Sequence, residues 1–162
     1  MSEPPIATLA QRVRARRREY FANCSRDAIA FHSMLGDDEV DIDSFCHHCA
    51  QPIRIELRGG RATLVEPAHT IVYLALRPTQ WWADIITTCS NTMVFFAGSD
   101  HRDASDLCAP TDQAASLAPD QTHQVGIPLY SRRLSIDYAR PGRDELNAHF
   151  AAQGLTGPYW QI

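Results

Sequence analysis

The chain has 162 residues, 44% of them hydrophobic and 21% charged, which is the composition of a globular protein with a single domain. A formal net charge of −4 argues against a general nucleic-acid binder, and no apolar run approaches the roughly 20 residues needed to cross a bilayer. Because acid and proline stand at the N-terminus where a signal peptide would be basic and then apolar, we expect a cytoplasmic protein with neither membrane nor nucleic-acid partners.

The N-terminal segment is rich in arginine. Residues 5–18 are predicted to form a short helix whose apolar side holds Ile6, Leu9 and Val13, so that residues 1–18 are a helical extension of a domain spanning 19–162. The arginines are Arg12, Arg14, Arg16, Arg17 and Arg18. They could contact phosphate, but the rest of the chain has no basic stripe, which favours a solvated helix face.

The next segments alternate between helix and strand. Residues 19–23 are expected to be extended, and residues 25–35 to form a helix with Asn23 as N-cap and Gly36 as its end. Residues 40–45 and 52–57 alternate between apolar and polar side chains as strands do. A hairpin turn over residues 58–61 then leads into a strand over 62–65.

The second half of the chain shows weaker patterns. We expect strands over residues 70–76 and 92–96, helices over 81–88 and 98–107, a loop over 108–124, and closing helices over 128–138 and 143–153. Strands and helices interspersed with hairpin connections favour an α+β domain with small mixed or antiparallel sheets and flanking helices.

Five cysteines in a cytoplasmic chain indicate thiol chemistry or metal binding rather than a disulfide framework. Cys24 stands where a short strand meets a helix, and the positive end of a helix favours a thiolate. Asp27 follows three residues later, on the same face of the predicted helix. Cys89 precedes a buried strand and could return to the same pocket. These three residues are the candidate catalytic site.

Residues 20–96 carry an ordered set of motifs. They are Cys-x-x-Asp at the start of a helix, a cysteine before a Gln-Pro-Ile hairpin strand (46–53), a Val-Glu-Pro segment (65–67), and a cysteine before Phe-Phe-Ala (89–97). In this order, and with the closing stretch 154–160, the chain resembles the organomercurial (alkylmercury) lyase family. Members of that family usually have a separate helical domain before this core, and here about nineteen residues precede it. An uncovered apolar face would favour a homodimer.

The resemblance implies an activity and a role for each candidate. Cys24 and Cys89 match the cysteines that hold the mercury of the substrate, and Asp27 matches the acid beside them that protonates the departing carbon. Thiolates are the preferred ligands of soft metals, and a carboxylic acid at the carbon supplies general acid catalysis. The implied enzyme takes a small-molecule substrate and has no bound cofactor. It consumes exogenous thiol and leaves Hg(II), or another soft metal, on the two cysteines.

Two other functions are compatible with the same residues. One is a relative recruited to a different substrate, for instance in specialised metabolism, with the same Cys/Asp site. The other is a non-catalytic protein that binds metal through its thiols.

A second cysteine pair resembles half of a zinc site. Cys46 and Cys49 have the spacing of metal ligands, but no second half follows, and His101 shows no ligand spacing. Cys46 matches a structural cysteine of the family, so we assign Cys46 to the core and Cys49 to a turn. A metal knuckle shared across a dimer is the alternative.

Overall fold

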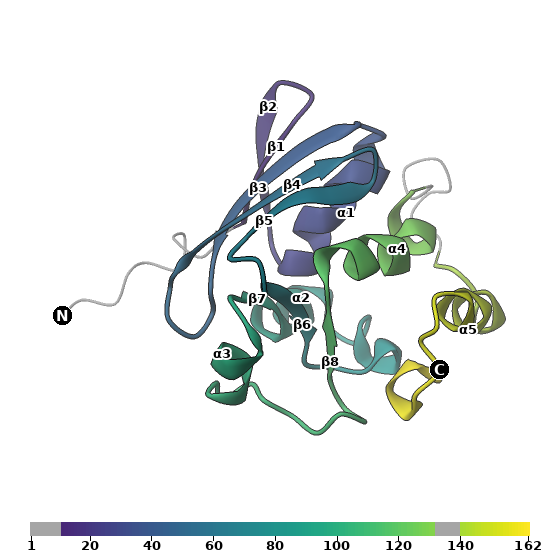
Figure 1. Cartoon of the computed structure of the whole chain (residues 1–162). Coiled ribbons are helices and arrows are strands. Elements are labelled where there is room, and N and C mark those ends of the chain that lie inside the picture. The colour runs from purple at the N-terminus through teal and green to yellow at the C-terminus, as the bar shows by residue number, and fades with distance from the viewer. Residues whose placement is uncertain (1–10, 132–139) are drawn as a thin grey trace.

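Two antiparallel sheets and the helices around them make up the chain, whose computed structural model describes residues 11–131 and 140–162 (Figure 1). The larger sheet has the order β2-β1-β3-β4-β5, and the smaller one has the order β7-β6-β8. The larger sheet comprises β1 (Gln11–Ala15), β2 (Arg18–Ala22), β3 (Glu39–Phe45), β4 (Pro52–Arg58) and β5 (Arg61–Glu66). The smaller sheet comprises β6 (Ile71–Leu74), β7 (Met93–Phe96) and β8 (Ala115–Leu117). The α+β fold class expected from the sequence is confirmed.

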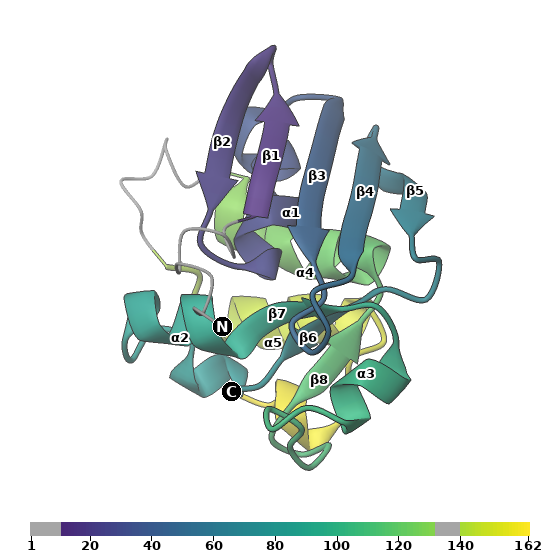
Figure 2. The same ribbon diagram turned by 90° about the vertical axis from the view of Figure 1, so that its left-hand side faces the viewer.

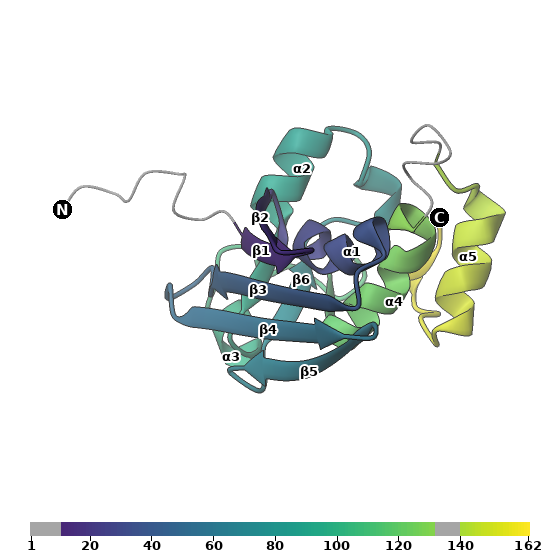
Figure 3. The same cartoon turned by 90° about the horizontal axis from the view of Figure 1, so that it is seen from above.

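The helices lie on one side of the larger sheet and around the smaller one. They are α1 (Ser25–Leu35), α2 (Ile85–Thr92), α3 (Ser99–Asp103), α4 (Pro119–Tyr130) and α5 (Arg143–Ala152), with 3-10 turns η2 (Pro78–Gln80) and η3 (Pro158–Trp160). Figure 2 shows α1 and α4 behind the larger sheet, and Figure 3 shows α5 beyond α4. Among the helices of the described residues, none combines the length and apolar character that crossing a bilayer requires.

Alternation of side chains in β1, β3 and β4 gives the larger sheet one apolar and one polar face. The apolar face is fully buried at Val13, Val40, Ile42, Ile55 and Leu57. Burial of each such side chain contributes about 1.5–3 kcal/mol. This face packs on α1 and joins the smaller sheet in one hydrophobic core. The start of α1 is therefore held between the two sheets.

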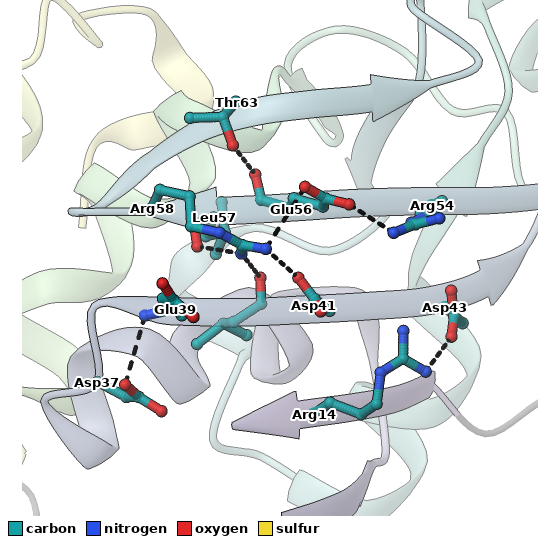
Figure 4. A network of polar contacts seen from close by, with 11 residues as sticks. Arg14, Asp37, Glu39, Asp41, Asp43, Arg54, Glu56, Leu57, Arg58 and Thr63 are labelled. Carbon is teal, nitrogen blue, oxygen red and sulfur yellow. Dashed lines mark hydrogen bonds and ion pairs between the residues drawn. The ribbon is translucent and has the colours of Figure 1, made fainter. Parts of the chain in front are cut away.

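The polar face carries cross-strand ion pairs (Figure 4). Arg14 Nη1 lies 2.6 Å from Asp43 Oδ2, and Arg58 Nη2 lies 2.7 Å from Asp41 Oδ1. Arg12 likewise lies 3.7 Å from Glu19 on the neighbouring strand. These groups are partly exposed, so each pair stabilises the fold by less than about 1 kcal/mol. The pairs place opposite charges beside each other on neighbouring strands.

The predicted N-terminal helix was wrong for residues 11–18. These residues form β1 and the start of β2, joined by Arg16 and Arg17 with φ angles of 49° and 60°. Val13 and Ala15 face the core at the period-2 spacing of a strand, and β1 pairs with both β2 and β3. β1 is thus an interior strand of the larger sheet, between β2 and β3. Residues 5–10 of the predicted helix lie outside the described residues.

Most of the other predicted elements are present with shifted ends. The helix expected over 81–88 begins at Ile85, the helix expected over 98–107 spans Ser99–Asp103, and the predicted loop 108–124 contains β8 and the start of α4. The helix expected over 128–138 begins earlier, since α4 starts at Pro119, and it ends at Tyr130. Residues 132–138 of the expected helix lie outside the described part.

Candidate active site

Cys24 caps the first turn of α1. Its backbone is extended, with φ −147° and ψ 169°, and its sulfur accepts a hydrogen bond from the backbone N–H of Asp27 at 3.4 Å. The cap expected at Asn23 is therefore one residue later. The side chain of Cys24 is completely buried. At this position the unpaired N–H groups and the helix dipole stabilise negative charge on sulfur.

Asp27 projects from the first turn of α1 toward two different partners. Its Oδ2 atom lies 3.0 Å from Sγ of Cys89, and its Oδ1 accepts a hydrogen bond from the hydroxyl of Tyr130. One donor atom from each of Cys24, Asp27 and Cys89 lies within 4.8 Å of the others. The structure thus brings together all three residues that the sequence singled out.

Cys24 and Cys89 are joined as a disulfide, with their Cα atoms 5.4 Å apart. The sequence had predicted free thiols here. Cys89 lies on α2, and the link crosses 65 residues of sequence. Cys46, Cys49 and Cys108 are free. The pair must be reduced before either sulfur can bind a metal, since the thiolate is the ligand form.

Arg26 and Tyr130 support the carboxyl group of Asp27. Nε of Arg26 donates a hydrogen bond to the Tyr130 hydroxyl at 3.0 Å, and its guanidinium lies 4.6 Å from the centre of the Trp81 ring. Burial raises the pKa of Tyr130 to about 12, so that its phenol stays a neutral donor near pH 7. Sequence reasoning missed both residues. For Arg26, the available signal was the position of a charged residue between Cys24 and Asp27 in the sequence. In the structure its side chain is buried.

A cavity of about 310 Å³ opens over Asp27 and Cys89. Its apolar lining includes Phe21, Phe31, Met34, Trp81 and Trp82. Trp81 is buried and Trp82 is half-buried, and both contribute to the wall of this cavity. A larger hollow of about 490 Å³ lies elsewhere, around Tyr73, Cys108 and Trp160, and shares no lining residue with the first.

The other singled-out residues lie apart from this pocket. Cys46 is buried in the core, and Cys49 is exposed in the turn after β3, as expected. His101, for which no ligand role was predicted, lies beside both of these sulfurs. His32 is half-buried, with its Nδ1 atom 3.0 Å from Nε2 of His123.

Comparisons with known proteins agree with this arrangement. The family model for alkylmercury lyase matches residues 8–131. Among solved structures, the crystal structure of the mercury-bound form of MerB2 is similar, with a TM-score of 0.64 at 19% sequence identity. The match covers 80% of this chain and 59% of that one, so this chain spans about three fifths of the length of that relative. No curated protein sequence gives a significant match. Since the family model covers well over half of its length, the chain belongs to the alkylmercury lyase family.

Proposed function

We propose that the protein cleaves a carbon–mercury bond by protonolysis, with Cys24 and Cys89 as mercury ligands and Asp27 as proton carrier. One observation carries the proposal: the carboxyl group of Asp27 lies 3.0 Å from one cysteine sulfur, while the backbone N–H of the same residue contacts the other. A non-catalytic thiol site for mercury needs no such acid. Protonolysis requires a proton donor within reach of the bond that breaks.

Binding of the substrate begins at Cys89, because Cys89 lines the cavity whereas Cys24 is completely buried. The thiol of Cys89 gives its proton to Oδ2 of Asp27 and displaces the thiolate R′S⁻ from R–Hg–SR′, which forms Cys89–S–Hg–R. The thiolate of Cys24 then adds to mercury as the second thiolate. Extra electron density from sulfur weakens the carbon–mercury bond, because mercury is a soft metal with high affinity for thiolates.

Cleavage follows from the protonated Asp27. The carboxylic acid gives its proton to carbon, which keeps the electron pair of the carbon–mercury bond and leaves as R–H. Mercury stays Hg(II) on the two thiolates, and Asp27 is a carboxylate again. Two exogenous thiols then remove Hg(II) and return the protons to the cysteines. The sum is R–Hg–SR′ + R′SH → R–H + Hg(SR′)₂.

Two features of the site support this chemistry. Tyr130 holds Oδ1 of Asp27, which leaves Oδ2 directed at Cys89. The aromatic lining of the cavity offers an apolar surface to the organic group of the substrate. Before the first turnover, two exogenous thiols must reduce the disulfide, giving two protein thiols and one exogenous disulfide.

Benzene release from phenylmercury acetate tests the proposal. The reduced protein, incubated with excess thiol, should release benzene over many turnovers, as followed by gas chromatography. Cys24→Ser should abolish turnover, whereas Cys108→Ser, which removes an exposed free thiol away from the pocket, should not. Mercury binding without benzene would favour a thiol carrier or a relative recruited to another substrate. Unchanged turnover in Cys24→Ser would refute the site.

A further inference from the structure

A second cluster of metal-binding side chains lies away from the proposed active site. One donor atom from each of Cys46, Cys49 and His101 lies within 4.8 Å of the others. Nδ1 of His101 is 3.5 Å from Sγ of Cys46 and 3.2 Å from Sγ of Cys49. Cys89 lies on α2, before β7, whereas Cys46 contacts the backbone just after β7. Figure 2 shows α2 and α3 at opposite ends of β7, so the two clusters are separate.

The backbone holds the two cysteines in a tight turn. Cys46 follows β3, its N–H donates to the carbonyl of Gln51, and the N–H of Ala50 donates to the carbonyl of Cys46. The turn is fixed to the smaller sheet, because the N–H of His47 donates to the carbonyl of Phe95 at 2.9 Å. In addition, the N–H of Ala97 points at the sulfur of Cys46 at 3.4 Å. Such a donor stabilises the negative charge of a metal-bound thiolate.

His101 has the surroundings of a metal ligand. It lies on α3, so the chain brings it to the turn from 52 residues beyond Cys49. While Nδ1 faces the two sulfurs, the other ring nitrogen lies 3.8 Å from Oδ2 of Asp100. At this distance the carboxylate adds negative charge near the ring but does not accept a hydrogen bond from it.

The distances suit one zinc ion. Zinc binds thiolate sulfur at about 2.3 Å and imidazole nitrogen at about 2.0–2.1 Å, so two such donors of a tetrahedron stand roughly 3.6 Å apart. The observed sulfur–nitrogen separations of 3.5 and 3.2 Å need only a small outward shift. The third donor, an imidazole nitrogen, also favours zinc over mercury(II), because mercury(II) needs only two thiolate ligands.

We infer that Cys46, Cys49 and His101 bind a resident Zn(II) ion, with solvent at the fourth coordination position. Within the described residues the cluster has three donors, and Cys49 is exposed, so water has access. The ion would join the β3–β4 turn to α3 and so fix two segments distant in sequence. This inference is independent of the proposed function, because the ion is neither substrate nor product.

Zinc content of the purified full-length chain tests the assignment. The reduced protein, stripped with a chelator and titrated with Zn(II), should bind one equivalent, as read by native mass spectrometry and by competition with a chromophoric chelator. Cobalt(II) in its place should give a thiolate charge-transfer band and the visible bands of a tetrahedral site. Cys49→Ser and His101→Ala should each weaken zinc binding by at least about 100-fold.

Matched variants separate this site from the other thiols. His48→Ala removes a neighbouring exposed histidine, and Cys24→Ser disables the active-site pair. Both should keep the equivalent of zinc. Loss of zinc in Cys24→Ser, loss in His48→Ala, or retention in His101→Ala would overturn the assignment. Because the readout is metal content, failure here leaves benzene release unaffected, and failure of benzene release leaves zinc binding intact.

Discussion

Asp27 uses its two carboxyl oxygens for different purposes. Oδ2 lies 3.0 Å from Cys89, and Oδ1 accepts from the hydroxyl of Tyr130. Tyr130 is in turn held by Arg26, whose guanidinium packs on Trp81. A carboxyl group fixed on one side cannot turn its other oxygen away from the thiol. We therefore regard Tyr130 and Arg26 as positioning residues for the proton transfer.

The variant Tyr130→Phe tests that role. It keeps the ring but removes the donor to Asp27, so the carboxyl group can rotate out of line with Cys89. We expect kcat for benzene release to fall by about 10- to 100-fold, because small misplacements of a catalytic group have effects of this size. Mercury affinity should stay unchanged, since both thiols remain. Steady-state kinetics beside a mercury titration provides the measurement.

Tyr159→Phe is the matched control. Its hydroxyl is also buried and donates to the carbonyl of Leu76 at 2.8 Å, but the residue does not line the active-site cavity. This variant should lose stability of about 1 kcal/mol and keep kcat. An equal loss of kcat in both variants would mean that Tyr130 acts only through the stability of the fold.

At the scale of elements, the turn between β1 and β2 offers a test of the hairpin. Arg16 and Arg17 both have positive φ, the conformation of a two-residue type I′ turn, which favours glycine at its second position. Arg17→Gly should therefore raise the free energy of unfolding by about 0.5–1 kcal/mol. Urea denaturation measures the change.

The neighbouring strand residue supplies the comparison for that test. Arg18→Gly places glycine in β2 instead, where the backbone is extended and other residues adopt it without strain. This variant should lower the free energy of unfolding by about 0.5–1 kcal/mol. Should Arg17→Gly destabilise the chain as much as Arg18→Gly does, the hairpin geometry would be wrong.

Alternation of side chains made the strands β3, β4 and β5 predictable, and each is present close to its predicted position. β1 was missed because Val13 fits both the period-2 pattern of a strand and the i, i+4 spacing from Leu9 that suggested a helix. Only pairing with β3, which lies beyond α1 in the sequence, decides between them. The start of α4 was missed because Pro119 was assigned to a loop and the helix was expected to begin at Pro128, although proline at the first helical position, where Pro119 stands, is favourable.

Local spacing placed Cys24 and Asp27 together, but the remaining site residues come from afar. Tyr130 lies 103 residues beyond Asp27, and His101 lies 52 residues beyond Cys49. Neither separation leaves a periodic signal in the sequence. Contacts of this kind depend on how α4 packs on α1 and on where α3, which follows β7, lies in the fold. Only the tertiary structure shows these arrangements.

At the scale of the whole molecule, the disulfide ties α1 to α2 across 65 residues. Closing a loop of that length restricts the unfolded chain, so the oxidised protein should be more stable than the reduced one by about 3–4 kcal/mol. Reduction should nevertheless be required for benzene release, because a bonded sulfur cannot bind mercury. Denaturation with and without a thiol reductant, followed by activity on the same samples, measures both effects.

Cys24→Ser serves as the control for redox dependence. Without the bond, its stability should not respond to the reductant. If the oxidised wild-type protein released benzene as fast as the reduced protein, the two cysteines could not be the mercury ligands.

In the proposed mechanism, Asp27 delivers the proton to carbon. The most direct test is a single turnover of the reduced protein with an equivalent of phenylmercury, comparing wild type with Asp27→Asn. Benzene is measured by gas chromatography and protein-bound mercury by native mass spectrometry in the same sample. Wild type should release benzene and retain Hg(II). Asp27→Asn should retain the phenylmercury adduct, with benzene release slowed by at least about 100-fold. Benzene release by Asp27→Asn at the wild-type rate would contradict the account.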